Sequence, residues 1–186
     1  MPATAWRLDF AAHQLRRGGV VAYPTEAVWG LGCDPWNASA TARLLSLKRR
    51  SQGQGLILIA DRADRFDAFL AGLTEAQRQR VVASWPGPNT WLVPHRGLVP
   101  AWIRGGHGTV ALRVPGHGEA RALCAAFGAP LVSTSANPHG LPPARCRLQL
   151  ERYFHRRLDA VVPGSVGGLS RPSAIRDACS GALLRN

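Results

Sequence analysis

Residues 109–137, TVALRVPGHGEARALCAAFGAPLVSTSAN, contain the pattern that decides the fold. TVALRVP at the start and PLVST near the end are short apolar runs of the kind that form buried strands. Apolar residues at helical spacing lie between them and predict a helix over Glu119–Phe127. A strand, a helix and a second strand in succession predict an α/β domain.

The same alternation continues on both sides of this segment. The predicted strands are 20–23, 56–60, 90–94, 160–163 and 173–176, and the predicted helices are 8–15, 39–49, 74–85 and 148–158. We predict that residues 24–37, PTEAVWGLGCDPWN, form an irregular loop. No repeat or low-complexity linker interrupts the chain. The sequence therefore predicts one domain over residues 1–186, with a mixed or largely parallel sheet flanked by helices.

The composition makes the chain strongly basic. Its 186 residues include 23 lysines and arginines against 11 acidic residues, a formal net charge of +12 at pH 7. Such a charge favours polyanionic partners, namely nucleotides, nucleic acids or anionic membrane surfaces. A hydrophobic fraction of 46% excludes disorder as the main state. Lys48 is the single lysine, and a compact ammonium group does not freely replace a planar guanidinium at a phosphate site.

Several classes of site have no motif in the sequence. The four cysteines show neither CxxC nor Cys/His metal-binding spacing, so no metal site is predicted. There is no GxxxxGK[ST], GxGxxG, HExxH or GxSxG motif, so a nucleotide enzyme would need a different phosphate-binding loop. Without a signal peptide or a long apolar run, the chain is expected to be cytoplasmic, with reduced thiols and no membrane segment.

Cationic side chains occur at two places that suit an anion. Lys48 and Arg50 lie at the end of a predicted helix, where cations also stabilise the negative end of the helix dipole. Their K-x-R spacing equally allows both to converge on a phosphate. Arg113 lies within an apolar strand and needs a partner, because an unpaired buried charge is costly. That partner is either an acidic residue of the chain or a ligand carboxylate or phosphate.

Small polar residues follow two of the predicted strands. Residues 133–137, STSAN, offer hydroxyls, an amide and backbone N–H groups to an anion or a sugar, or else form a hydrogen-bonded turn. Thr25 and Glu26 follow the strand 20–23. Glu26 is a candidate base or a partner for one of the many arginines, and pairing is the favoured interpretation.

Six motifs occur in an order and at a spacing that resemble one family. They are YPTEAVWGLG, LKRRSQGQGLILIA, WPGPNT, RVPGH, PLVSTSAN and RPSAIRD. The chain resembles the TsaC/YrdC-like threonylcarbamoyl-AMP synthases. The resemblance implies a twisted α/β sheet around a positively charged concave cavity. It also implies a reaction that joins L-threonine, bicarbonate and ATP into threonylcarbamoyl-AMP and pyrophosphate, for the threonylcarbamoyladenosine modification of tRNA next to the anticodon.

The same resemblance implies roles for particular residues. Lys48 and Arg50 would hold the ATP triphosphate, and Lys48 would stabilise charge on the α-phosphate. The residues implied for L-threonine are Thr25, Arg113 and Ser133, and those implied for the nucleotide are Lys48, Arg50, Ser135, Asn137 and Ser173. Mg2+ would be carried with ATP and bound mainly through phosphate oxygens and water.

Four positions depart from the family pattern. Ser51 stands where a proline is usual, and Ile59 stands where the long form often has a histidine. His139 lies in a Pro-His-Gly sequence that replaces the usual Ser-Gly ending, and Ala174 replaces a threonine. None of these departures removes a cationic group. Because the chain ends shortly after RPSAIRD, we expect no C-terminal extension domain, and transfer onto tRNA would fall to separate proteins.

The sequence leaves two other interpretations open. A non-enzymatic protein that binds structured RNA, such as tRNA or rRNA, would also explain the positive charge, although no recognised RNA-binding motif is present. The two functions can coexist, because a synthase can deliver its product while binding tRNA weakly. A carbamoyl-adenylate enzyme that uses carbamoyl phosphate shares the fold, but it normally belongs to a much larger chain.

Overall fold

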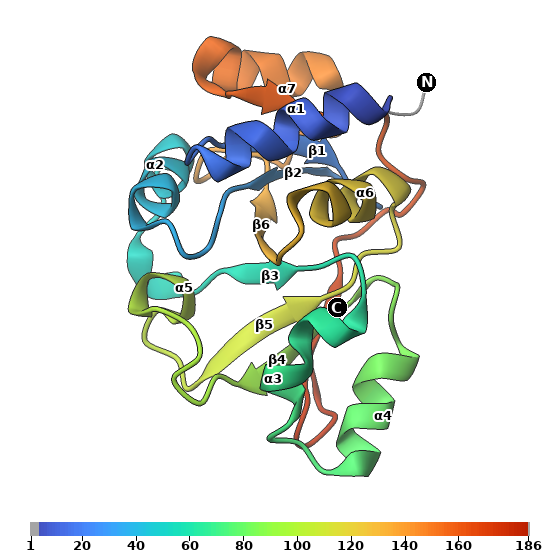
Figure 1. Cartoon of the computed structure of the whole chain (residues 1–186). Coiled ribbons are helices and arrows are strands. Elements are labelled where there is room, and N and C mark those ends of the chain that lie inside the picture. The colour runs from blue at the N-terminus through green and yellow to red at the C-terminus, as the bar shows by residue number, and fades with distance from the viewer. Residues whose placement is uncertain (1–3, 186) are drawn as a thin grey trace.

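The computed structural model describes residues 4–185, in which helices pack against a nine-stranded sheet (Figure 1). The strands are β1 (Val21–Pro24), β2 (Trp29–Gly32), β3 (Ile57–Ile59), β4 (Asn89–Pro94), β5 (Thr109–Arg113), β6 (Leu131–Ser135), β7 (Ala160–Val161), β8 (Ala174–Asp177) and β9 (Leu183–Arg185). The helices are α1 (Ala5–Arg16), α2 (Ala38–Lys48), α3 (Asp67–Leu70), α4 (Glu75–Ala83), α5 (Ala101–Arg104), α6 (Gly118–Phe127) and α7 (Arg147–Phe154). Three short 3-10 helices are η1 (Gln52–Gln54), η2 (Ala63–Phe66) and η3 (His155–Arg157).

The sheet is mixed, with the strand order β7-β1-β2-β6-β3-β5-β4-β8-β9. Parallel pairing joins β1 to β7, β3 to β5 and β4 to β8. The other neighbours are antiparallel. The prediction of an α/β domain with a mixed sheet is therefore confirmed, whereas the largely parallel alternative is wrong.

Residues 109–137 form the predicted strand, helix and strand, but the two strands are not neighbours. β3 lies between β5 and β6 in the sheet. It is parallel to β5 and antiparallel to β6, so β5 and β6 run in opposite directions. Because β3 comes from a distant part of the chain, the local pattern could not predict this insertion.

The expectation of an irregular loop over residues 24–37 is wrong in one respect, because Trp29–Gly32 forms β2. Its two glycines lower the strand propensity of the segment, so the sequence pattern does not indicate a strand there. Close packing explains them. A Cβ at Gly30 would lie 3.0 Å from the Tyr23 ring, and one at Gly32 would lie 2.7 Å from the Val132 carbonyl oxygen.

The first predicted strand buries side chains on both of its faces. Val20 and Ala22 belong to the larger hydrophobic cluster, whereas Val21 and Tyr23 belong to a second one. Successive strand residues point to opposite faces, so an apolar layer covers each face of this strand. α1 and α6 pack against each other and supply apolar side chains to the second cluster (Figure 1).

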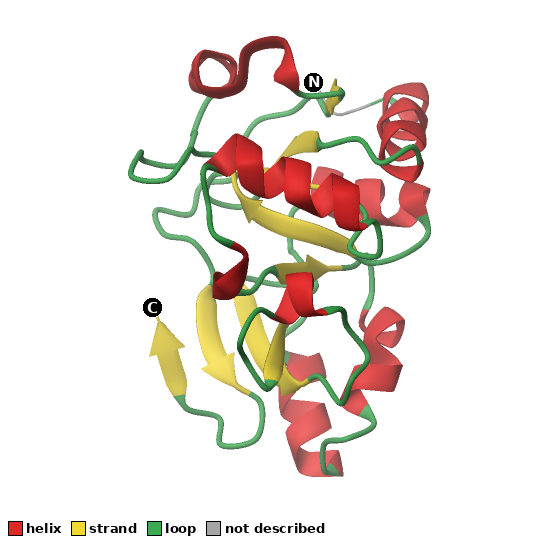
Figure 2. Ribbon diagram, turned by 90° about the vertical axis from the view of Figure 1, so that its left-hand side faces the viewer, coloured by secondary structure: helices red, strands yellow, loops and turns green. Residues whose placement is uncertain are grey.

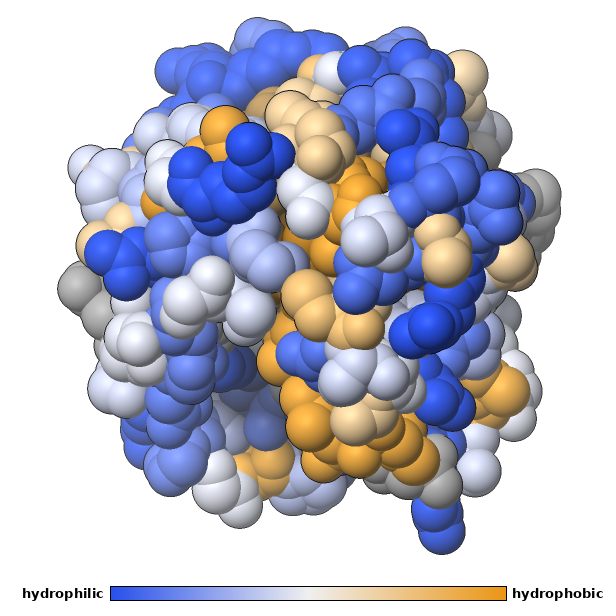
Figure 3. Space-filling model, turned by 90° about the horizontal axis from the view of Figure 1, so that it is seen from below, coloured by the Kyte–Doolittle hydropathy of each residue, from blue (hydrophilic) through white to orange (hydrophobic). Residues whose placement is uncertain are grey.

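The two edge strands of the sheet are β7 and β9. β9 forms one edge of the sheet, beside the C-terminus (Figure 2). Seen from below, a band of hydrophobic residues lies between hydrophilic regions (Figure 3). Within residues 4–185, every helix is too short or too polar to cross a membrane.

Candidate active site

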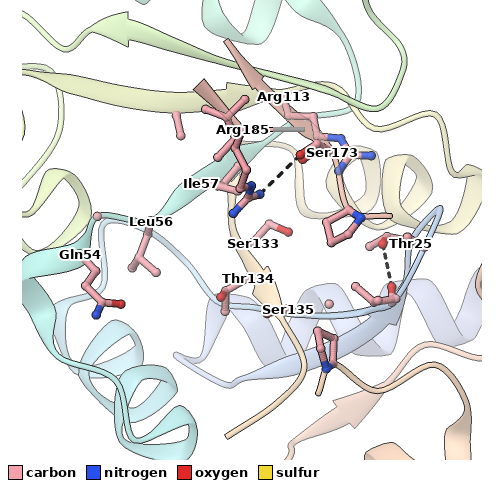
Figure 4. Close-up of a pocket in the computed structure, with 18 of the residues that line it drawn as sticks. Thr25, Gln54, Leu56, Ile57, Arg113, Ser133, Thr134, Ser135, Ser173 and Arg185 are labelled. Atoms are coloured by element: carbon pink, nitrogen blue, oxygen red, sulfur yellow. Dashed lines mark hydrogen bonds between the residues drawn. The ribbon is translucent and has the colours of Figure 1, made fainter. Parts of the chain in front are cut away.

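A cavity of about 490 Å³ opens beside β6, at the point where this strand changes its pairing partner. β3 pairs with Leu131–Ser133, whereas β2 pairs with Thr134 and Ser135. Ser133, Thr134 and Ser135 line the cavity (Figure 4). A cavity of this size suits a small-molecule ligand.

Six of the eight residues implied by the family resemblance line this cavity. They reach it from the loop between β1 and β2, the segment after α2, the ends of β5 and β6, and the segment before β8. The six are Thr25, Arg50, Arg113, Ser133, Ser135 and Ser173. Lys48 and Asn137 do not belong to the lining. In Figure 4, Thr25 and Arg113 lie on one side of the cavity and Gln54 on the other.

Arg113 has an acidic partner, which was one of the two alternatives that the sequence left open. Its Nη2 forms an ion pair with Glu26 Oε1, and only 12% and 13% of the two side chains are exposed. Its Nε donates to the Gly87 carbonyl oxygen at 3.1 Å. The same Glu26 oxygen accepts the Gly116 N–H at 2.6 Å. These contacts fix the guanidinium at the cavity wall, and Nη1 takes part in none of them.

α2 ends at Lys48 because the next residue, Arg49, adopts the left-handed conformation with φ 52°. Arg50 therefore lies outside the helix. Its Nη2 donates to the Gly55 carbonyl oxygen at 2.9 Å, and its Nη1 donates to Thr134 Oγ1 at 3.4 Å. Burial, followed by the charge of Arg185, lowers the pKa of the guanidinium. A partly desolvated cation of this kind favours an anionic ligand.

Lys48 ends α2 and is only 4% exposed. Its Nζ donates to the carbonyl oxygen of Ser135 and, at 2.9 Å, to that of Asn137. Burial, followed by the charge of Arg50, lowers its pKa from 10.5 to about 8. Asn137 in turn accepts from Ser135 Oγ at 2.6 Å and donates to the Leu141 carbonyl oxygen at 2.7 Å. The ammonium group therefore holds the loop after β6 from behind the cavity wall.

The hydroxyl groups of Thr25 and Ser173 have different surroundings. Thr25 Oγ1 donates to the Val28 carbonyl oxygen at 2.7 Å, which leaves its lone pairs to accept from a ligand. Ser173 is buried, and its Oγ shares a hydrogen bond of 2.8 Å with Thr90 Oγ1. Its carbonyl oxygen accepts from Arg185 at 3.5 Å (Figure 4).

The sequence did not single out several basic residues of the lining. Arg104, His107, Arg171 and Arg185 come from α5, the following loop and the C-terminal segment. In a chain this rich in arginine, spacing alone could not separate them from surface charges. Among the described lining residues there are five arginines and one carboxylate, that of Glu26. Residues 4–185 contain no cluster of three or more His, Cys, Asp and Glu side chains suited to a metal ion.

Comparison with known proteins assigns the chain to a family. Residues 13–186 match the Sua5/YciO/YrdC family, described as telomere recombination. The chain belongs to the Sua5/YciO/YrdC family. A Stutzerimonas stutzeri relative named threonylcarbamoyl-AMP synthase is 57% identical over 180 residues, which are 97% of each chain. A Pseudomonas fluorescens relative of the same name is 54% identical over 182 residues, 98% of each chain.

Solved structures confirm the Sua5/YciO/YrdC fold. P. abyssi Sua5 complexed with L-threonine is 29% identical, with a TM-score of 0.86, and the match covers 92% of this chain and 51% of that one. The architecture expected from the sequence, a single α/β domain with a mixed sheet flanked by helices, is thus confirmed. The expected positive field of the cavity remains a prediction that the lining arginines support.

The four positions predicted from the sequence to depart from the TsaC/YrdC-like pattern lie outside the cavity lining. They are Ser51, Ile59, His139 and Ala174. Ile59 is 3% exposed and lies opposite Arg113 in the pairing of β3 with β5. Its side chain belongs to the second hydrophobic cluster, so an isoleucine at this position serves packing.

Proposed function

We propose that the protein is an L-threonylcarbamoyladenylate synthase, a nucleotidyltransferase that condenses L-threonine, bicarbonate and ATP into threonylcarbamoyl-AMP and pyrophosphate. The observation that carries this proposal is the single cavity on which Arg50, Arg113 and the hydroxyl groups of β6 converge. L-Threonine carries a carboxylate, bicarbonate is an anion and ATP carries phosphates. A cavity lining rich in arginine suits all three. The close relatives named threonylcarbamoyl-AMP synthase support the same reaction.

L-Threonine binds at the Arg113 side of the cavity in this proposal. Gly87 and Glu26 already orient the guanidinium, so its remaining N–H groups can pair with the substrate carboxylate. The hydroxyl groups of Thr25 and Ser133 hold the polar remainder of the amino acid. The P. abyssi Sua5 complex with L-threonine, which shares the fold, supports an amino-acid site.

The nucleotide binds toward Arg50, with Ser135 and Ser173 around it, and Asn137 shapes this part of the cavity from behind the lining by accepting from Ser135 Oγ. The threonine amine first attacks the carbon of bicarbonate, or of CO2 formed from it, to give a carbamate. A carbamate oxygen then attacks the α-phosphorus of ATP, and pyrophosphate leaves. Mg2+ carried with ATP would be held through phosphate oxygens and water. Because negative charge gathers on the phosphates, positioning and neutralisation by cations dominate catalysis.

Lys48 stabilises charge on the α-phosphate in this mechanism. In the structure its ammonium group binds the carbonyl oxygens of Ser135 and Asn137. It reaches the nucleotide by exchanging these neutral acceptors for phosphate oxygens, which are stronger acceptors because they are charged. Lys48 thereby links the loop after β6 to nucleotide binding.

The product is a reactive mixed anhydride that must be passed on to tRNA. We place the protein in the cytoplasm, with separate proteins that transfer the threonylcarbamoyl group to the adenosine next to the anticodon. The net charge of +12 is compatible with weak direct binding of tRNA during this delivery.

The test is pyrophosphate release from ATP, with L-threonine and bicarbonate each present or omitted. Release that requires all three substrates is the expected result. A folded protein that releases no pyrophosphate under any combination would contradict the proposal. Its affinity for tRNA, measured against salt concentration, would then test the RNA-binding alternative.

A further inference from the structure

Glu26 carries two carboxylate oxygens with very different surroundings. Oε1 pairs with Arg113 and accepts the Gly116 N–H at 2.6 Å. Oε2 is buried and receives no hydrogen bond from the part of the chain that the structure describes. A buried carboxylate oxygen without a donor is costly, because it has lost its water. Because Glu26 belongs to the cavity lining, a ligand bound there can supply the missing donor.

The backbone around Glu26 is fixed on both sides. The Leu169 N–H donates to the Glu26 carbonyl oxygen at 3.1 Å, and the Gly167 N–H donates to that of Thr25 at 2.9 Å. Glu26 lines the cavity together with Arg113 and Thr25. Its carboxylate is therefore held beside the arginine that suits the carboxylate of an amino acid.

We propose that Glu26 binds the α-ammonium group of the amino-acid substrate and removes a proton from it. This inference rests on the proposed function. In an α-amino acid the ammonium and carboxylate groups are attached to the same carbon atom, so a carboxylate paired with Arg113 leaves the ammonium group within the same small region. Glu26 supplies the only carboxylate among the described residues of the cavity lining.

Removal of a proton from the ammonium group comes first. Glu26 Oε2 takes one proton from the ammonium group and becomes a neutral carboxyl group. The freed nitrogen lone pair attacks the bicarbonate carbon and forms the C–N bond. The bond from this carbon to its hydroxyl group breaks, and the hydroxyl leaves as water with a second proton from the nitrogen. A carbamate anion remains, and Glu26 later returns its proton to solvent.

The alternative is that Glu26 only orients Arg113. Glu26→Gln separates the two roles, because glutamine keeps an Oε1 that accepts from Gly116 and Arg113 but cannot take a proton. The other basic residues around this site are Arg113 on β5, His117, which follows the Gly116 that donates to Glu26, and Arg171 in the cavity lining. These groups are the same in the wild type and in Glu26→Gln. Their contribution to the pH dependence therefore cancels in the ratio of the two activities.

The experiment measures kcat/KM for L-threonine by pyrophosphate release between pH 6.0 and 7.5. The wild type should be nearly independent of pH, because Glu26 accepts the proton. Glu26→Gln should be about 100-fold slower or worse, and its ratio to wild type should rise about tenfold per pH unit with the fraction of free amine. Glu119→Gln is the matched control, because Glu119 pairs with His117 outside the cavity lining, and it should keep a constant ratio near one.

Several outcomes would overturn the inference. A Glu26→Gln ratio that is constant with pH, even with a raised KM for threonine, would leave Glu26 as a positioning residue for Arg113. A wild-type rate that itself rises tenfold per pH unit would exclude an internal base, even if Glu26→Gln fails to fold. A wild type without pyrophosphate release would instead refute the proposed function, so the two failures are distinguishable.

Discussion

At the residue scale, the geometry of Arg113 leaves room for a ligand beside its internal partner. The sequence predicted that a charge within an apolar strand needs a partner, but it could not say which one. The structure supplies Glu26, which is far away in the sequence. Glu26 and Gly87 engage Nη2 and Nε, so the pair orients the guanidinium and leaves Nη1 for a substrate.

Arg113→Ala should therefore weaken threonine use more than ATP use. Loss of a charge-assisted hydrogen bond of about 1.5–3 kcal/mol predicts a KM for threonine raised roughly 10- to 100-fold. The KM for ATP should change much less. Initial rates with each substrate varied in turn measure both values, and Arg62→Ala serves as an exposed control. A variant with an altered KM for ATP alone would assign Arg113 to the nucleotide.

Lys48 gives a prediction for stability. Burial lowers its pKa from 10.5 to about 8, so between these values the unfolded chain binds more protons than the folded one. The free energy of unfolding should then rise with pH across this window, by at most about 3 kcal/mol from Lys48. Urea denaturation near the two ends of the window measures the rise. Lys48→Met should lack it, and an equal rise in both proteins would contradict the lowered pKa.

The same titration affects turnover. If the ammonium group stabilises the α-phosphate, activity of the wild type should fall as the pH rises above about 8, because Lys48 then loses its charge. Lys48→Met should be inactive at pH 7 by comparison, while its circular dichroism shows that it is folded. Wild-type turnover by the folded variant would remove Lys48 from the mechanism.

At the scale of elements, the sequence predicted what local patterns determine and missed what depends on distant packing. The alternation of apolar runs predicted β1, β3, α6 and β6 close to their observed positions. β2 was missed because Gly30 and Gly32 reflect contacts with Tyr23 and β6 rather than strand propensity. The local sequence pattern likewise could not predict that β3 lies between β5 and β6, because the pairing partners come from distant segments of the chain.

Gly32→Ala tests this account of β2. Its Cβ would meet the Val132 carbonyl oxygen at 2.7 Å and the Tyr23 ring at 2.9 Å, so β2 and β6 would have to separate. We expect a loss of roughly 1–3 kcal/mol in the free energy of unfolding. Activity should also fall, because β6 carries Ser133 and Ser135. Gly108→Ala, where a Cβ meets nothing within 4 Å, is the control and should leave both unchanged.

At the scale of the whole molecule, a net charge of +12 and a cavity lined by arginines should act together on an anionic substrate. The charge was evident from composition. The position of several arginines around one cavity was not, because Arg104, Arg171 and Arg185 come together only through the fold. A positive field of this kind attracts ATP over a distance, whereas L-threonine has no net charge and is not steered.

Salt should therefore separate the two substrates. Raising the salt concentration from about 50 to about 300 mM shortens the screening length and should lower kcat/KM for ATP roughly 3- to 10-fold. The value for threonine, measured with saturating ATP, should change little and serves as the control within the same enzyme. Equal salt effects on both would mean that salt acts on the protein itself. No effect on either would mean that the arginines act only at contact distance, through the local geometry around Arg50 and Arg113.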